Sequence, residues 1–139
     1  MYQYYDENPD PRVYVRNCRY GKKGQKRTHN DCVVRAMQQI WEVDWVTALR
    51  RLVERGIEFY TLPNTADVWQ SFCRKTNNYT VYKKNGKRKL LSEIAKETKG
   101  DPQGYIVRTR QHIVFVRDGK YFDNWDSGGY AAWSIWELE

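Results

Sequence analysis

Apolar positions recur at helical spacing through much of the chain after residue 30. Side chains three and four residues apart share one face of a helix, so this spacing predicts amphipathic helices. Asp44 is the expected N-cap of the second of them and Gly56 its expected end, while Thr65 or Asn64 is expected to cap the third. The predicted helices begin at about Cys32 and then cover 45–55, about 66–75 and 90–98.

Alternating apolar and polar positions dominate the last third of the chain. This period of two predicts strands, which are joined by short turns and therefore pair antiparallel. Residues 1–11 are expected to be irregular because Pro9 and Pro11 interrupt regular structure. Helices early and hairpin-linked strands late favour an α+β fold, with a helical half packed on an antiparallel sheet. The predicted strands are 12–18, 79–82 (followed by a tight turn at Asn85-Gly86), 104–109, 112–117, 120–125 and about 130–137.

Length and composition limit the classes of protein. With 139 residues, 40% of them apolar and 15% aromatic, we expect one globular domain over 1–139. The apolar runs are too short for a membrane span, and the first residues do not resemble a signal peptide. Three widely spaced cysteines fit free thiols in a reducing cytoplasm better than disulfides.

The net charge of +7 is concentrated in two basic segments, residues 22–27 and 83–89. Such segments can bind nucleic acid or an acidic protein partner. Solvated loops that keep the protein soluble are the simpler interpretation, because runs of charge usually do only that. No helix-turn-helix, zinc-finger or RNA-binding signature accompanies the charge.

Cys32 is the first candidate for chemistry because it stands at the predicted start of a helix. Free N–H groups and the helix dipole at such a position lower the pKa of a thiol, whose thiolate is the nucleophile. The effect requires that Asn30 or Asp31 caps the helix. Arg35, one turn on, would assist the thiolate and the Asp31 carboxylate would oppose it, and the sequence leaves this balance open.

His112 is the candidate base, since the other histidine, His29, lies in a loop rich in Lys and Arg. A two-residue turn at Asp118-Gly119 would place Val116 opposite Tyr121, as Asx-Gly turns favour. Asp123 would then lie diagonally across from His112 on the same face of the hairpin. We therefore predict that Asp123 orients the His112 imidazole.

Two other residues are alternatives to Asp123 as the residue that orients His112. A three-residue loop would shift the register by one and bring Asn124 to the His112 side instead. Asp126 is the other alternative. Trp125 has its own simple interpretation as a large aromatic residue of the core.

The segments 28–36, 112–116 and 119–127 together resemble the papain-like superfamily of cysteine peptidases, and most closely the small bacteriocin-leader-peptidase-like proteins of phages and bacteria. The helix at 90–98 and residues 104–107 add to the likeness, which covers roughly 26–136. The resemblance implies a papain-like α+β fold and a Cys32–His112–Asp123 triad. It also implies that Trp125, two residues after Asp123, shields the contact between His112 and Asp123 from water.

The oxyanion hole departs from that family. Papain-like enzymes usually carry a Gln about six residues before the nucleophile, but position 26 is Lys and the nearest Gln is Gln25. Gln25 and the side chain of Asn30 are the candidate donors, and an enzyme without either would be slow or lapsed. The stretch Cys32–Ala36 is also similar to OTU-type deubiquitinases, which implies an isopeptide substrate as an alternative to a linear peptide.

These observations predict a cysteine hydrolase that cleaves a peptide, isopeptide or related amide bond through a thioester, without a cofactor. Cys18, His29 and Cys32 match no common zinc module, so no metal is expected. The alternative from another class is a non-catalytic papain-like effector of a phage or bacterium, which binds nucleic acid or an acidic host protein through its basic surface.

Overall fold

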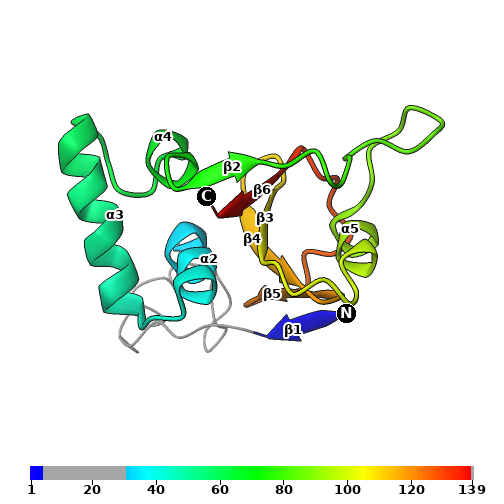
Figure 1. Cartoon of the computed structure of the whole chain (residues 1–139), viewed down its shortest axis with the longest axis horizontal. Coiled ribbons are helices and arrows are strands. Elements are labelled where there is room, and N and C mark those ends of the chain that lie inside the picture. Colours follow the sequence, from blue (N-terminus) through cyan, green and yellow to red (C-terminus); the bar gives the residue numbers. More distant parts are fainter. Residues whose placement is uncertain (5–30, 139) are drawn as a thin grey trace, which may run out of the picture.

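The structure of the chain is a computed structural model that describes residues 1–4 and 31–138. Within these residues the helices and strands form one mixed α+β arrangement (Figure 1), as the sequence predicts. In chain order the elements are β1 (Tyr2–Tyr4), α2 (Cys32–Trp41), α3 (Trp45–Phe59), α4 (Ala66–Gln70), β2 (Cys73–Lys75), α5 (Leu91–Glu97), β3 (Tyr105–Arg108), β4 (Ile113–Arg117), β5 (Lys120–Asp123) and β6 (Ser134–Leu138).

The six strands form one sheet in the order β1-β5-β4-β3-β6-β2. All neighbours pair antiparallel except β1, which runs parallel to β5 and places Tyr4 beside Asp123. Residues 2–4 are therefore a strand, and the expectation that the first residues are irregular is wrong there. Pairing with β5 supplies the backbone hydrogen bonds that make this short segment regular.

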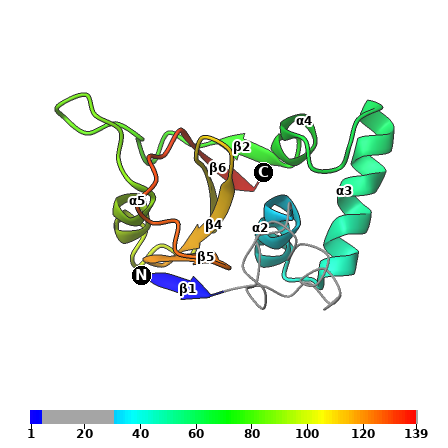
Figure 2. The same ribbon diagram turned by 180° about the vertical axis from the view of Figure 1, so that it is seen from behind.

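Both faces of the sheet are covered. Figures 1 and 2 show α2, with α3 and α4, on one side of the strands and α5 on the other. The strands alternate accordingly: Ile106 and Phe115 pack on the side of α2, while Val107 and Val114 pack on the side of α5. Successive side chains of a strand point to opposite faces, and a sheet covered twice buries both sets.

The second predicted helix is correct at its start and wrong at its end. The Asp44 side chain caps α3 by accepting a hydrogen bond of 2.7 Å from the Thr47 N–H. The helix passes through Gly56 and ends at Phe59. A Cβ at position 56 would lie only 2.8 Å from the Thr61 carbonyl oxygen, so this glycine allows a close approach of the chain and does not end the helix.

The third predicted helix, 66–75, is too long. Helix α4 stops at Gln70, and Cys73–Lys75 pair with β6 as the edge strand β2. Strand pairing overrides the helical spacing of these residues. Cys73 is nevertheless buried in the core.

Two further predicted strands differ from those in the structure, and a third lies outside the described residues. Residues 79–82 form no strand and make a single bridge, between Tyr82 and Arg88, around the predicted Asn85-Gly86 turn. The last strand is Ser134–Leu138, shorter and later than the predicted 130–137. The predicted strand 12–18 lies outside the described residues.

The hairpin of β4 and β5 has the predicted register. Arg117 pairs with Lys120 and Val116 with Tyr121, so the turn contains only Asp118 and Gly119. Both turn residues have positive φ, 49° and 76°, which matches the right-handed twist of the strands. The open end of the hairpin consequently carries His112, just before β4, and Asp123, the last residue of β5.

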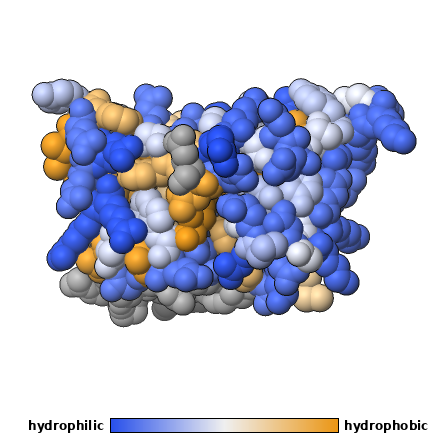
Figure 3. Space-filling view, viewed as in Figure 1, coloured by the Kyte–Doolittle hydropathy of each residue, from blue (hydrophilic) through white to orange (hydrophobic). Residues whose placement is uncertain are grey.

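The surface is uneven in polarity. In Figure 3 the half of the face over α5 and the preceding loop is mostly hydrophilic, whereas apolar side chains reach the surface over α3 and α2. The basic segment 83–89 lies in that loop, and two of its lysines pair with glutamates of α5: Lys83 with Glu93 at 3.2 Å and Lys89 with Glu97 at 2.8 Å. No helix in the described ranges is long and apolar enough to cross a membrane.

Candidate active site

Cys32 is the first residue of α2, so its sulfur lies at the positive end of that helix. Asp31 occupies the N-cap position, but its side chain makes no capping hydrogen bond. The carboxylate instead pairs with Arg35 and accepts a hydrogen bond of 3.2 Å from the Trp45 indole. Arg35 therefore compensates the charge of Asp31 that would have opposed a thiolate at Cys32.

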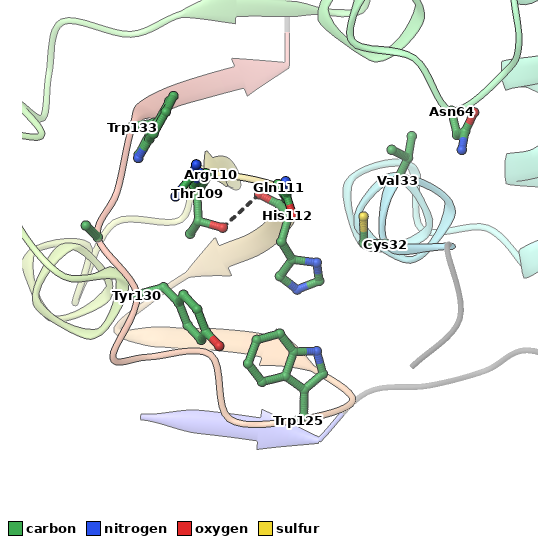
Figure 4. A pocket seen from close by; sticks show the side chains of 11 residues that line it. Cys32, Val33, Asn64, Thr109, Arg110, Gln111, His112, Trp125, Tyr130 and Trp133 are labelled. Atoms are coloured by element: carbon green, nitrogen blue, oxygen red, sulfur yellow. Dashed lines mark hydrogen bonds between the residues drawn. The ribbon is translucent and has the colours of Figure 1, made fainter. Parts of the chain in front are cut away.

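His112 lies between the thiol and a carboxylate. Its Nε2 donates a hydrogen bond of 2.6 Å to Asp123 Oδ2, since a carboxylate oxygen can only accept. The ring also hydrogen-bonds Cys32, which leaves Nδ1 as the atom that serves the sulfur. Figure 4 shows Cys32 at the start of its helix, with the His112 ring next to it in the cleft. The predicted juxtaposition of these three residues is present.

The ionisation of the pair follows from these contacts. Burial alone would raise the pKa of Cys32, but the hydrogen bond and charge of His112, a backbone hydrogen bond from Ile113 and the charge of Arg35 together lower it. Burial would lower the pKa of His112, and the contacts with Asp123 and Cys32 outweigh it and raise this pKa to about 9. The two groups thus favour a thiolate beside an imidazolium.

Asp123 is held from several directions and is almost fully buried. Its Oδ2 also accepts from the Ser127 hydroxyl at 2.7 Å, and its Oδ1 accepts from the Asn124 N–H at 2.8 Å. Arg35 Nη2 lies 3.6 Å from Oδ1, and the Tyr2 hydroxyl donates to the Asp123 carbonyl oxygen at 3.2 Å. Neighbours that fix a carboxylate in this way also fix the ring that it orients.

The alternatives to Asp123 point elsewhere. Among the described contacts Asn124 meets Asp123 through its N–H and makes none with His112. Asp126 accepts from the Tyr121 hydroxyl at 2.5 Å and from the Gly128 N–H at 3.0 Å. Both alternatives for the residue beside His112 are therefore wrong, because the two-residue turn sets the parity that presents Asp123.

Trp125 covers the His112 ring, as the resemblance implies. The two ring centroids are 5.3 Å apart with planes tilted by 31°, and Tyr130 packs edge-on against Trp125 at 5.2 Å. A large apolar ring over an imidazole excludes water and strengthens the ionic contacts beneath it.

Both oxyanion candidates, Gln25 and Asn30, and the basic segment 22–27 lie outside the described residues. The backbone N–H of Cys32 belongs to the first turn of α2, where no intrahelical acceptor exists. This N–H is therefore free to donate a hydrogen bond beside the Cys32 sulfur.

Sequence reasoning missed three supports of Asp123: Ser127, Tyr2 and the second contact of Arg35. The spacing of Asp123 and Ser127 by four residues across a turn is a signal for such a hydrogen bond. The contact of Tyr2 with Asp123 could not be predicted from the sequence, because it depends on the parallel pairing of β1 with β5.

An open cleft of about 870 Å³ runs past Cys32 and His112. Val33 and Asn64 line it beside Cys32, and Arg110 and Trp133 line it beyond His112 (Figure 4). Within the described residues no group of three His, Cys, Asp or Glu side chains could hold a metal ion. Comparison with known protein families, curated proteins and solved structures gives no match for this chain.

Proposed function

We propose that this protein is a cysteine hydrolase that cleaves a peptide, isopeptide or related amide bond. One observation carries the proposal: His112 lines the cleft together with Cys32, and it bridges this thiol to the buried Asp123. A thiol, a base and a group that orients the base are the parts that nucleophilic amide hydrolysis needs.

In the first half of the reaction the Cys32 thiolate attacks the amide carbonyl carbon, and a C–S bond forms. The carbonyl oxygen becomes an oxyanion that the Cys32 N–H stabilises at the end of the helix. The C–N bond then breaks, and the imidazolium of His112 gives its Nδ1 proton to the leaving amine. A thioester on Cys32 and a neutral His112 remain.

In the second half a water molecule attacks the thioester carbonyl carbon. His112 takes a proton from this water, and the C–S bond breaks to release the carboxylic acid product. The thiolate and the imidazolium are restored together. Throughout, the hydrogen bond of 2.6 Å to Asp123 holds the imidazole in the tautomer that presents Nδ1 to the sulfur.

A papain-like assignment is part of this proposal. It is supported by the order Cys, His, Asp along the chain, by a nucleophile at the start of a helix that packs on a mainly antiparallel sheet, and by Trp125 over the His112 ring. A deubiquitinase-like isopeptidase would use the same three residues, and the identity of the substrate amide separates the two.

Alkylation of Cys32 by iodoacetamide across pH tests the proposal. With mass spectrometry resolving each cysteine, Cys32 should react fast well below the ordinary thiol pKa of ~8.5. His112→Ala should slow this reaction at pH 6 by about 10- to 1000-fold, the effect of removing an adjacent opposite charge.

Gln111→Ala is the matched control, since Gln111 precedes His112 in the chain and lines the same cleft. Its Cys32 should react like that of the unaltered protein. A Cys32 that titrates as an ordinary thiol and ignores His112→Ala would contradict the proposal and favour a non-catalytic binding protein.

A further inference from the structure

The cleft beyond His112 is positively charged. Arg110 lines it and makes no ion pair with a described residue, and no Asp or Glu is among the described residues that line the cleft. An unpaired guanidinium on the wall of a cleft is a ready partner for a carboxylate or another anionic group.

The positive charge of the surface continues past Trp133. This half-exposed ring also lines a second cavity of about 410 Å³, together with Lys75 and Arg88. Arg88 stacks on Trp133 at 5.3 Å and on Tyr82 at 5.0 Å, and it donates to the Ala132 carbonyl oxygen at 3.0 Å. Among its described lining residues this cavity too has no carboxylate.

The chemistry assigns this charged surface to one side of the substrate. His112 must protonate the leaving amine, so the leaving segment passes on the His112 side of the sulfur. Figure 4 shows Arg110 and Trp133 on that side, and Val33 and Asn64 on the opposite side, next to Cys32. The cationic half of the cleft therefore faces residues that follow the scissile bond.

We propose that the surface from Arg110 across Trp133 to Arg88 binds an acidic polypeptide segment on the leaving-group side of the cleaved amide. Arg110 contacts the first carboxylate, Trp133 supports an apolar side chain, and Arg88 and Lys75 attract further acidic residues. This substrate class rests on the proposed function, and charge complementarity is what selects it.

Two alkylating probes of equal shape test the proposal without a known substrate. They are the N-bromoacetyl dipeptide amides of Leu-Asp and Leu-Asn, in which the Cys32 sulfur displaces bromide and forms an S–C bond. At low ionic strength the Asp probe should label Cys32 about three- to fivefold faster than the Asn probe, the range of an exposed ion pair. At ~1 M salt the preference should vanish, because screening removes it.

Arg110→Gln should abolish the preference for the Asp probe. Arg117→Gln is the matched control, since Arg117 ends β4, the strand that follows the loop of Arg110, lies outside the cleft and should leave the preference intact. Equal rates for the two probes, or a preference that survives Arg110→Gln, would overturn the proposal. So would protection of Cys32 from iodoacetamide by a short single-stranded DNA but not by an Asp-rich peptide of equal charge.

The labelling experiments separate the acidic substrate from the proposed hydrolase function. Neutral iodoacetamide carries no charge to recognise, so its labelling of Cys32 in the unaltered protein reports the thiolate alone. If Cys32 is activated but shows no preference between the two probes, only the proposal of an acidic substrate is contradicted. If Cys32 reacts as an ordinary thiol, the proposed hydrolase function is contradicted.

Discussion

The two ends of the β4–β5 hairpin differ in what determines them. At the turn end, Asp118 and Gly119 adopt positive φ values that only a few residue types tolerate, so the local sequence dictates the conformation. At the open end, His112 and Asp123 receive contacts from parts of the chain up to 121 residues away.

The open end gathers its contacts from three other segments. Cys32 and Arg35 come from α2, Tyr2 comes from β1, and Ser127 comes from the loop after β5. These groups set the charge of His112 and the orientation of Asp123. A short turn thus sets which residues meet, while long-range contacts set the ionisation of the residues that meet. Changes at the open end should alter reactivity, and changes at the turn end should alter only stability.

Asp123→Asn should have the largest effect. The change keeps the shape of the side chain but removes the charge that holds His112 as an imidazolium, so the pKa of His112 falls and that of Cys32 rises. Iodoacetamide labelling of Cys32 at pH 6 should slow by about 10- to 1000-fold, as for the loss of a neighbouring opposite charge. Asp126→Asn is the control on the same loop and should change the rate little, because Asp126 contacts Tyr121 and Gly128.

Ser127→Ala should come next. It removes a buried hydroxyl that donates 2.7 Å to Asp123 Oδ2, and hydrogen bonds to charged groups contribute about 1.5–3 kcal/mol. We expect a loss of that size in the free energy of unfolding by urea, together with slower Cys32 labelling. Ser92→Ala, on α5, is the control. Unchanged stability and rate would show that Asp123 is positioned without Ser127.

The pH dependence of stability is a further test of the open end. The pKa of His112 is raised in the folded protein, so its protonation stabilises the fold. This contribution is complete below pH 6.5 and is lost as the pH rises through about 9. A lowered pKa makes Cys32 do the reverse: its contribution is complete above the ordinary value of 9.0 and is lost as the pH falls through the lowered value. The two trends oppose each other between the lowered pKa of Cys32 and its ordinary value of 9.0, wherever the pH is also above 6.5.

Cys32→Ala removes one of these trends and so exposes the other. Relative to the unaltered protein, the variant should lose stability as the pH rises from the lowered pKa of Cys32 to its ordinary value of 9.0, by at most about 1.4 kcal/mol per pH unit. Urea unfolding from pH 5 to 10 measures the difference between the two proteins, which cancels groups common to both. A difference that does not depend on pH would contradict the ion pair.

Gly119→Ala should have the smallest effect, and it changes the turn end of the hairpin. A side chain at a φ of 76° costs about 1 kcal/mol, while the Cys32 labelling rate should not change. Gly129→Ala is the control, because a Cβ there meets open space. A change in labelling rate after Gly119→Ala would show that the turn also determines the reactive pair.

The sequence was sufficient for the features that depend on local signals. The start of α2, the Asp44 cap of α3 and the Asp118-Gly119 turn each follow from one or two residues and their neighbours. The hairpin register then brought His112 and Asp123 together, and this needed only strand parity.

What the sequence could not supply depends on distant pairing. Strand β2 has helical spacing and becomes a strand only against β6, and β1 becomes one only against β5. The competition between Asp31 and Arg35 at Cys32 was open for the same reason. The two side chains turned out to pair with each other, while Arg35 also approaches Asp123.

The tilted stack of Trp125 on His112 has an optical consequence. A protonated imidazole quenches the fluorescence of a neighbouring indole more strongly than a neutral one does. The emission of Trp125 should therefore brighten as His112 loses its proton near pH 9. A pH titration of tryptophan emission should therefore follow the charge on His112 without added dye, substrate or label.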